Sequence, residues 1–315
     1  MIVISASELK SCLTIPACID AIEDLYRHEY KAIFEQPART LTRINESSII
    51  FTMPAYSKKL GKFAVKIVSE FRGNTLSRKP VQGGSVVLID ASDGSTLATI
   101  DAPALTAIRT GAVSGLATRI LAPKESKNVA VLGSGQQAKA QLEAIQAVRD
   151  IQSAFVYSPN YSHARNFAKE MRSMLHIDVT ALKERTGFRS LPVDIIIAAT
   201  NSAIPVIAWD EDVSENCHIN SIGTLPERRE LDLMTICNSS IFVDSKESVL
   251  REAGDIMDAI QNHAIGEQNI LGDLGDLLRH NWSKRREKTT LFKSVGFGLQ
   301  DVYAASKAYE YFTSK

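Results

Sequence analysis

The sequence predicts an α/β protein with two domains, and three observations support this class. A chain of 315 residues is longer than most single hydrophobic cores support. Its residues are 44% apolar and 23% charged, a balance typical of folded globular proteins. From Ala104 onward strand-like and helix-like segments alternate, which predicts a parallel sheet with helices on both faces.

The charge and metal-ligand content exclude several function classes. The 36 basic residues balance the 36 acidic ones, so no overall field attracts nucleic acid or an anionic membrane. One basic run, 279–288, is interpreted as a solvated loop or helix face. The 4 cysteines and 6 histidines lack metal-ligand spacing, which predicts free thiols and no metal site.

The N-terminus and the apolar runs bear on localisation. The stretch MIVISASELK has no basic region followed by an apolar segment and a cleavage site. No apolar run reaches the roughly 18 residues that a membrane-spanning helix needs. We therefore expect a cytoplasmic protein without a membrane or nucleic-acid partner.

The N-terminal part has an α+β pattern. Thr14 and Pro16 are typical of a helix start, and apolar residues then recur at helical spacing, which predicts a helix over 15–35. Short apolar runs follow, and DASDG (Asp90–Gly94) predicts a hairpin turn between the last two. These runs predict an antiparallel sheet with strands at 48–53, 63–68, 84–91 and 95–101.

The second half of the chain carries the alternating pattern. Residues 102–122 are rich in small side chains and predict a closely packed helix. Apolar segments typical of buried parallel strands follow, together with helical segments at 136–148 and 161–175. The strands are expected within 127–132, 151–158, 193–200, 218–223 and 239–245.

A glycine turn after the first of these strands predicts a dinucleotide-binding Rossmann fold. VAVLGSGQQA contains Gly133-x-Gly135-x-x-Ala138, with a strand before it and a helix after it. The first glycine allows a tight turn, the second lets the backbone approach a diphosphate, and the small third residue allows close helix packing. The diphosphate would bind at the helix N-terminus, where free N–H groups favour an anion.

The end of the second strand bears on which nicotinamide cofactor is bound. NAD-specific sites usually have an acidic residue there, whereas this chain has Ser158, Pro159 and Asn160. A 2′-phosphate would therefore not be repelled, which favours NADP(H) slightly over NAD(H). Its expected partners are Ser158, Asn160, Ser162 or Arg165.

Eight motifs in the same order resemble the ornithine cyclodeaminase/mu-crystallin family. They are QPART, FTMPAY, KIVSEFRGN, LTAIRTGAVSGLA, VLGSGQQA, SIGTLPERRELD, LREAGD and KSVGFGLQD. The resemblance implies an α+β substrate-binding and dimerisation domain, 1–112 with 296–315, and a Rossmann NAD(P)-binding domain, 113–295. It also implies a homodimer that acts on a small α-amino or α-imino acid.

The same resemblance assigns roles to individual residues. It implies that Arg39, Lys66 and Arg109 converge on the substrate carboxylate, and that Asp232 is an acid/base catalyst. A guanidinium binds a carboxylate bidentately, and a lysine adds a charge and a proton, so Lys66 is also a candidate catalyst. Taken alone, Lys66 on its strand would be interpreted as a solvent-exposed lysine, and Asp232 as a helix-dipole contact.

Phe51 separates two activities within the family. The resemblance implies a glutamate at this position in ornithine cyclodeaminases, where it holds the distal amine, but this chain has Phe51. An apolar wall fits a cyclic or apolar side chain better, although Phe51 could simply pack in the sheet. We therefore expect an NAD(P)-dependent oxidoreductase: a ketimine or Δ1-pyrroline-2-carboxylate reductase, or an alanine dehydrogenase-like enzyme. The alternatives are an ornithine cyclodeaminase and, third, a non-catalytic protein that binds NADPH and a small acid.

The expected cofactor site includes residues from several loops as well as the glycine turn. The cofactor-binding residues that we expect are Thr110, Gly133, Gly135, Gln136, Gln137, Ser158, Asn160, Thr200 and Gly223.

Overall fold

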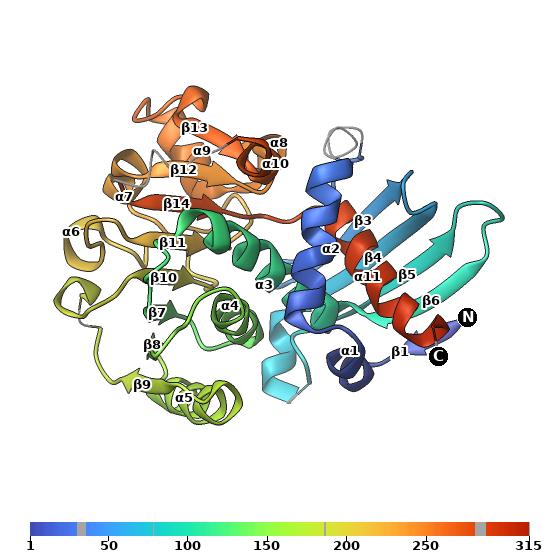
Figure 1. The fold of residues 1–315 in the computed structure, drawn as a ribbon, viewed down its shortest axis with the longest axis horizontal. Helices are drawn as coiled ribbons and strands as arrows, with labels where there is room; N and C mark the ends of the chain where they lie inside the picture. The colour runs from blue at the N-terminus through green and yellow to red at the C-terminus, as the bar shows by residue number, and fades with distance from the viewer. Residues whose placement is uncertain (30–35, 78, 186, 281–287, 315) are drawn as a thin grey trace. The chain divides into compact units, whose positions relative to one another are not determined.

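The chain divides into two compact units (Figure 1). The computed structural model describes residues 1–29, 36–77, 79–185, 187–280 and 288–314. Unit 1 comprises Met1–Arg109 and Phe297–Lys315, and unit 2 comprises Thr110–Gly296. Most of the basic run at 279–288 and the end of the helix expected over 15–35 lie outside the described residues.

Unit 1 contains a six-stranded sheet with the strand order β1-β6-β5-β4-β3-β2. The antiparallel strands and the turn at Asp90–Gly94 confirm the predicted hairpins. The sheet is mixed rather than purely antiparallel, because β1 pairs with β6 in parallel. The strands are β1 (Ile2–Ile4), β2 (Thr40–Asn45), β3 (Ser48–Ser57), β4 (Lys62–Phe71), β5 (Gln82–Asp90) and β6 (Thr96–Asp101).

Among the described residues, the helices α1 (Ala6–Cys12), α2 (Ile15–His28) and α11 (Gly298–Thr313) accompany this sheet. Thr14 caps α2 as expected, and α2 ends at His28 with Glu29 as its C-cap; residues 30–35 of the predicted helix lie outside the described residues. The C-cap residue Glu29 turns its carboxylate to the Ser57 and Tyr303 hydroxyls and the Lys59 N–H. These bonds connect the end of α2 to β3 and α11.

The two faces of the unit 1 sheet differ in their environment. Side chains alternate between faces along a strand, and α11 packs on β3 and β4. Lys66 pairs with Met53, and both are buried on the face that α11 covers. The opposite face presents half-buried or exposed apolar side chains in adjacent register, among them Pro54 with Val65 and Tyr56 with Phe63.

Unit 2 contains an eight-stranded sheet with the order β13-β12-β14-β11-β10-β7-β8-β9, in which all pairs are parallel. This confirms the Rossmann-type α/β class. The strands are β7 (Asn128–Leu132), β8 (Ser153–Tyr157), β9 (Asp178–Leu182), β10 (Ile195–Ala198), β11 (His218–Ser221), β12 (Ser240–Val243), β13 (Ile270–Asp273) and β14 (Thr290–Lys293). The sequence patterns did not predict β9, β13 or β14.

Helices cover the parallel sheet, and two apolar clusters fill the space between them and the strands. The helices are α4 (Gln136–Gln146), α5 (Tyr161–Leu175), α6 (Trp209–Asp212), α7 (Leu233–Asn238), α8 (Lys246–Glu252), α9 (Gly254–Gln261) and α10 (Leu274–Arg279). Helix α3 (Ala102–Leu121) contains the change of unit after Arg109. Because β7, β10 and β11 run parallel, their carboxyl ends lie at the same edge of the sheet. Open α/β sheets bind ligands at this edge.

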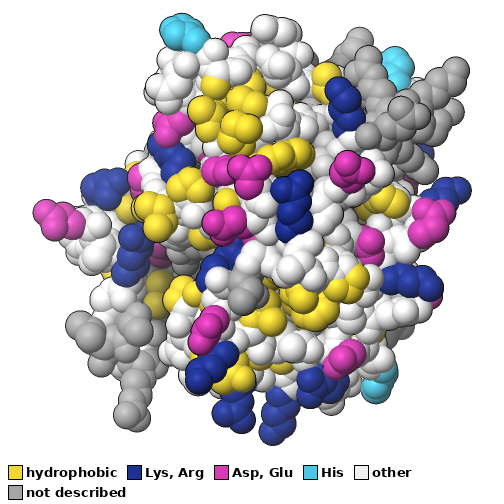
Figure 2. Space-filling model, turned by 90° about the vertical axis from the view of Figure 1, so that its left-hand side faces the viewer, with side chains coloured by type: hydrophobic (Ala, Val, Ile, Leu, Met, Phe, Trp, Pro, Cys, Tyr) yellow, Lys and Arg dark blue, Asp and Glu magenta, His cyan; other side chains and the backbone are white. Residues whose placement is uncertain are grey.

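One face of unit 2 shows how the equal numbers of basic and acidic residues are distributed. Figure 2 shows the face of unit 2 near α6 and α7, where basic and acidic side chains are interspersed with small apolar groups. Among the described helices, none has both the length and the apolar character to cross a membrane.

Candidate functional site

The glycine turn after β7 has the geometry that a diphosphate site requires. Gly133 has φ +104°, and a Cβ there would lie 2.3 Å from the Ala199 carbonyl oxygen, so only glycine fits. Gly135 caps α4, and no atom lies within 4 Å of its ideal Cβ position. Ala138, in the first turn of α4, is fully buried. The turn therefore leaves open space in front of the N-terminus of α4, where an anion is stabilised.

A cavity of about 630 Å³ opens in front of this turn, at the carboxyl ends of β7, β8 and β10. It is lined by Leu132, Gly133, Ser134, Gly135, Tyr157, Ser158, Pro159, Arg185, Ala199, Thr200, Asn201, Ser202, Pro205, Val206, Ile207, Ala208 and Glu211. This volume lies within the range of small-molecule and cofactor sites. Four expected cofactor residues contribute to the lining: Gly133, Gly135, Ser158 and Thr200.

The other expected cofactor residues lie outside the cavity lining. Asn160 caps α5 and accepts the Ser162 N–H at 3.0 Å, so its carboxamide oxygen serves the helix. The Thr110 carbonyl accepts a bond from Gln141. Gln136 and Gln137 begin α4, and the Gly223 N–H donates to Glu230 at 2.7 Å. Their contact with a cofactor therefore stays a prediction.

Arg185 is a basic lining residue that the sequence analysis did not identify. It follows β9, a strand that the apolar pattern did not reveal, whereas the search for a phosphate partner stopped at the end of β8. Its guanidinium carbon lies 4.8 Å from the Phe188 ring centroid, and Nη2 lies 2.5 Å from the buried Asp212 carboxylate. The arginine is thus fixed in place while still reaching the cavity.

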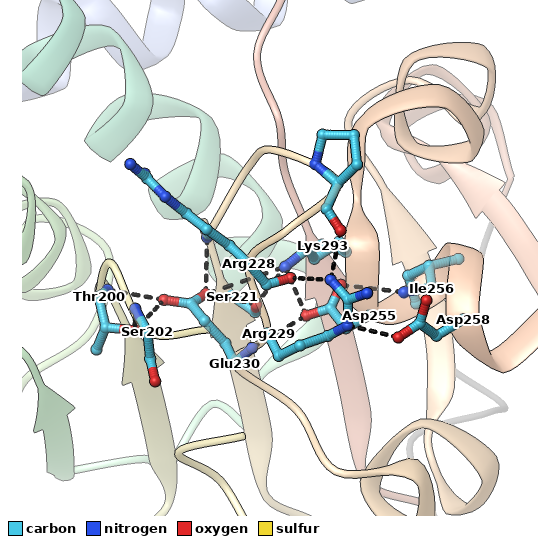
Figure 3. A network of polar contacts seen from close by, with 12 residues as sticks. Thr200, Ser202, Ser221, Arg228, Arg229, Glu230, Asp255, Ile256, Asp258 and Lys293 are labelled. Atoms are coloured by element: carbon cyan, nitrogen blue, oxygen red, sulfur yellow. Dashed lines mark hydrogen bonds and ion pairs between the residues drawn. The ribbon is translucent and has the colours of Figure 1, made fainter. Parts of the chain in front are cut away.

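Glu230 organises the loops that follow β10 and β11 (Figure 3). It is fully buried, and one carboxylate oxygen accepts the Thr200 N–H at 2.7 Å and the Thr200 hydroxyl at 3.0 Å. The other oxygen accepts the Ser221 hydroxyl and the Gly223 N–H, both at 2.7 Å. One carboxylate therefore holds two residues that were expected to contact cofactor. Glu230 belongs to the motif SIGTLPERRELD, but no spacing rule distinguishes it from its neighbours.

A buried lysine extends this network from β14. Lys293 Nζ lies 2.9 Å from Asp255 Oδ2 and donates to the Ser221 hydroxyl at 2.9 Å, and it is 4.0 Å from Glu230 (Figure 3). The lysine and both carboxylates are each at most 1% exposed. These contacts fix the ends of β11 and β14 to the start of α9.

Asp232 has a structural position at the start of α7. Its Oδ1 accepts the Thr235 N–H at 2.7 Å, and its Oδ2 accepts the Trp209 N–H at 3.1 Å. The carboxylate is therefore an N-cap that satisfies free backbone donors. Since Asp232 belongs to unit 2 and Lys66 to unit 1, a shared role in proton transfer stays a prediction.

In unit 1 the structure brings together Lys66, Arg109 and a residue that the sequence analysis did not assign, Asp301. Lys66 Nζ lies 2.9 Å from Oδ2 and 3.1 Å from Oδ1 of Asp301, and the two side chains are 2% and 1% exposed. Arg109 Nε donates to Asp301 Oδ1 at 3.1 Å, and its Nη1 donates to Gln300 Oε1 at 2.9 Å. Lys66 is therefore a buried cation and not a solvent-exposed lysine.

Arg39 and Phe51 lie in the same unit. The Arg39 guanidinium carbon is 6.0 Å from the Phe51 ring centroid, a cation–π distance, and Phe51 is buried. Phe51 is on the same strand face as Met53, whose partner across the sheet is Lys66. An apolar ring thus accompanies the cations.

Burial and the neighbouring charges shift the pKa values of Lys66 and Asp301. Burial lowers the pKa of Lys66 to about 7; Arg109 and Arg39 act in the same direction, and Asp301 opposes them. Burial would raise the pKa of Asp301, but Lys66 and Arg109 hold it below its usual value. With Lys66 protonated, two buried cations face one carboxylate, so the cluster can bind an anion, and Lys66 can exchange a proton near neutral pH.

No group of three or more potential metal ligands occurs among the described histidines, cysteines and acidic residues. All four cysteines are free thiols.

The chain is similar in sequence and in fold to several known proteins. A Δ1-pyrroline-2-carboxylate reductase of Bacillus cereus is 32% identical over 98% of this chain and 96% of the relative. The structure of Thermococcus litoralis Δ1-pyrroline-2-carboxylate reductase with NADH and L-proline is similar, with a TM-score of 0.91 and 34% identity, and the match covers 100% of this chain and 98% of that one. An archaeal alanine dehydrogenase dimer with bound NAD matches with a TM-score of 0.90 and 27% identity over 100% and 96% of the two chains.

A family model supports the same relationship. The model of the ornithine cyclodeaminase/mu-crystallin family matches residues 1–315, the whole chain. This protein belongs to the ornithine cyclodeaminase/mu-crystallin family.

Proposed function

We propose that the protein is an NAD(P)H-dependent reductase of a small α-imino acid, with a cyclic ketimine such as Δ1-pyrroline-2-carboxylate as substrate. The observation that carries the proposal is the buried Lys66–Asp301–Arg109 cluster, which has excess positive charge and a lysine whose pKa is about 7. The names of the similar proteins, two reductases of this imino acid and an alanine dehydrogenase, support the same reaction class.

The substrate carboxylate would bind to the cations of unit 1. In the contacts described for Arg109, Nε donates to Asp301 and Nη1 donates to Gln300. Nη2 is therefore the nitrogen that would bind a ligand. Arg39 adds a second guanidinium beside Phe51. Fixing the carboxylate orients the neighbouring imine carbon, which is what a hydride transfer requires.

Phe51 favours an apolar or cyclic substrate side chain. An ammonium group at the end of an ornithine side chain would lack a charge-assisted partner at this residue, a loss of about 1.5–3 kcal/mol. A five-membered imine ring has no such group. This argument makes ornithine cyclodeamination the weaker alternative.

The reaction adds a hydride to the imine carbon and a proton to the imine nitrogen, which gives the amine. When bound, the reduced nicotinamide supplies the hydride. Protonated Lys66 is the proton donor that we favour, because its pKa of about 7 places it near the optimum for general acid catalysis. Asp232 is the second candidate for this step, although its two oxygens already accept backbone N–H bonds.

The cavity of unit 2 would hold the cofactor. The Gly133–Gly135 turn would bind the diphosphate, and Ser158 and Thr200 would line the nucleotide path. The end of β8 carries Ser158 and Pro159 in place of an acidic residue, and Arg185 adds a cation to the lining. We expect NADPH to bind at least as tightly as NADH.

The exposed face of the unit 1 sheet would bind a second copy of the chain. Ile67 and Tyr56 are each 44% exposed there, next to half-buried Val65 and Phe63. A continuous apolar face on a sheet usually marks an interface. We therefore propose a homodimer formed through this face.

An assay with each cofactor and a substrate panel tests the proposed reaction. Purified protein is mixed with NADH or NADPH and Δ1-pyrroline-2-carboxylate, larger cyclic ketimines, or pyruvate with ammonia. The proposal predicts net oxidation of the cofactor, fastest with a cyclic ketimine. If ornithine with NAD⁺ gives proline and ammonia without net redox change, while no ketimine is reduced, the protein is a cyclodeaminase and the proposal is wrong.

A further inference from the structure

The position of Asp301 is set by the first turn of α11. A Cβ on Gly298 would lie 2.7 Å from the Ala55 Cβ, so this glycine lets the helix start directly against β3. Asp301 follows three residues later, one helical turn along, and its carboxylate meets Lys66 on the neighbouring strand β4. The backbone therefore determines which side chain faces the buried lysine.

Asp301 is the shared partner of both cations. The ion pairs of Lys66 and of Arg109 in the described part of the chain both go to this carboxylate. Gln300, the preceding residue, accepts the Nη1 proton of Arg109. The start of α11 therefore accepts hydrogen bonds from two of the three guanidinium nitrogens, Nε and Nη1, which fixes the plane of the guanidinium.

We propose that Asp301 is a positioning residue for imine reduction: it orients Arg109 for the substrate carboxylate and keeps the proton on Lys66 until transfer. This inference rests on the proposed function, since it assigns Asp301 a part in that reaction. The carboxylate itself does not enter the chemistry. Its negative charge keeps Lys66 protonated and orients the guanidinium of Arg109.

The charges around Lys66 give this role a pH signature. Asp301 on α11 favours the protonated lysine, whereas Arg109 on α3 and Arg39 before β2 disfavour it. Cys18 on α2 also lies near these charges, but burial raises the pKa of its thiol to about 12, so it stays neutral. In Asp301→Asn the two arginines act unopposed, and the pKa of Lys66 falls below about 7.

The test compares Asp301→Asn with Glu310→Gln, a change on the same helix at a carboxylate that is 46% exposed. The first readout is the titration of Lys66 in protein with ¹⁵N-labelled lysine side chains, without substrate, with the signal identified by its loss in Lys66→Met. The second is the pH profile of kcat/KM for the best ketimine.

The proposal predicts that Asp301→Asn shifts the Lys66 titration to lower pH by about one unit or more. It also predicts that kcat/KM falls about 10-fold at neutral pH and partly recovers as the pH is lowered. Glu310→Gln should change neither readout. An unchanged Lys66 titration, or a kcat/KM that falls equally at every pH, would overturn the proposal.

A second variant covers the case in which Asp301→Asn does not fold. Lys66→Met/Asp301→Asn removes the cation and its counter-ion together, and its affinity for pyrrole-2-carboxylate is compared with that of Lys66→Met. Loss of the Arg109 partner should weaken binding of this probe about 10-fold. Equal affinity would contradict the positioning of Arg109. If the wild-type protein reduces no imine, the proposed function fails, while the Lys66 titration still decides what Asp301 does.

Discussion

Lys66 and Asp301 are separated by 235 residues in the chain, yet they form a buried ion pair with Nζ 2.9 Å from Oδ2. The pair connects the central strand β4 of unit 1 to the C-terminal helix α11. It is one of the contacts that join the C-terminal helix to the N-terminal part of unit 1. The active lysine of the proposed reaction is therefore controlled by a segment that follows the whole of unit 2.

Removal of the Lys66 charge should abolish efficient reduction. Lys66→Met keeps the apolar part of the side chain but removes a carboxylate contact and a proton donor, so KM should rise and kcat should fall. We expect kcat/KM for the best ketimine to decrease by at least about 100-fold, measured by steady-state kinetics. Lys62→Met is the matched control, because Lys62 begins the same strand, and its Nζ is 5.6 Å from the Tyr309 ring centroid, away from Asp301. Equal rates for both variants and the wild type would refute the role of Lys66.

The same variant should also lose stability. In this variant the buried carboxylate of Asp301 would lose one of its two cationic partners. Arg109 remains, so we expect a loss of about 1–3 kcal/mol, below the 3–5 kcal/mol typical of an abandoned buried charge. Denaturant unfolding measures the change, and a more stable variant would contradict the ion pair.

The rate of reduction should depend on the protonation of Lys66. The lysine donates in its charged form, which predominates below its pKa of about 7, so kcat/KM should decrease as the pH rises through this value. Lys66→Met should lack this limb of the profile. A profile of the wild type that stays flat from pH 6 to 9 would show that no group with this pKa donates the proton.

Stability should depend on pH through the same residue. Burial lowers the pKa of Lys66 from 10.5 to about 7 in the folded state, so the unfolded chain binds more protons between these values. The contribution of Lys66 to the free energy of unfolding should therefore increase as the pH rises from 7 to 10.5. The difference between wild type and Lys66→Met, measured by urea unfolding at several pH values, isolates this contribution. A difference that is independent of pH would contradict the lowered pKa.

Two glycines of the cofactor turn should behave differently on substitution. Gly135→Val places its side chain in open space in front of α4, so the fold should persist while NAD(P)H binding is lost, as measured by fluorescence titration. Gly133→Ala would place a Cβ 2.3 Å from a backbone oxygen at a positive φ, so it should lower the Tm. Tight cofactor binding by Gly135→Val would show that the diphosphate lies elsewhere.

The apolar face of the unit 1 sheet should be an interface between two copies of the chain. Sedimentation should give about twice the mass of one chain for the wild type at micromolar concentration. Ile67→Lys places a charge on the exposed part of this face and should yield monomers that remain folded. Lys307→Met, a substitution at an exposed position of α11, is a control that should stay dimeric. A wild-type monomer with full activity would exclude the interface.

The sequence predicted those parts of the fold that have strong local patterns. β3 to β6 alternate or are bounded by turns, and the glycine turn is flanked by a clear strand and helix. The strands that were not predicted are β1, β2, β9 and β13, which lie at sheet edges, and β14. Length alone does not explain this, because β10, β11 and β12 also have four residues each and were predicted from the longer segments around them. α2 ends at His28, where Glu29 bonds to other elements, and no local pattern in the sequence indicated these contacts.

The candidate site was less predictable, because its key contacts join distant segments. Alternation in β4 showed that Lys66 shares a face with Ala64 and Val68, but not that α11 covers this face. Asp301 and Glu230 lie in motifs shared with the family. The residues next to them in the sequence do not indicate which side chains they bind. Both became recognisable only when strands and loops far apart in the chain were brought together.

The central claim is that the protein transfers a hydride to the α-carbon of an imino acid. It is tested most directly with NAD(P)H deuterated at the transferable C4 position and Δ1-pyrroline-2-carboxylate, followed by mass spectrometry and NMR of the product. The account predicts proline with one deuterium at Cα and one oxidised cofactor per proline formed. Proline without deuterium, or no product from any cyclic ketimine while ornithine is converted without net cofactor oxidation, would contradict it.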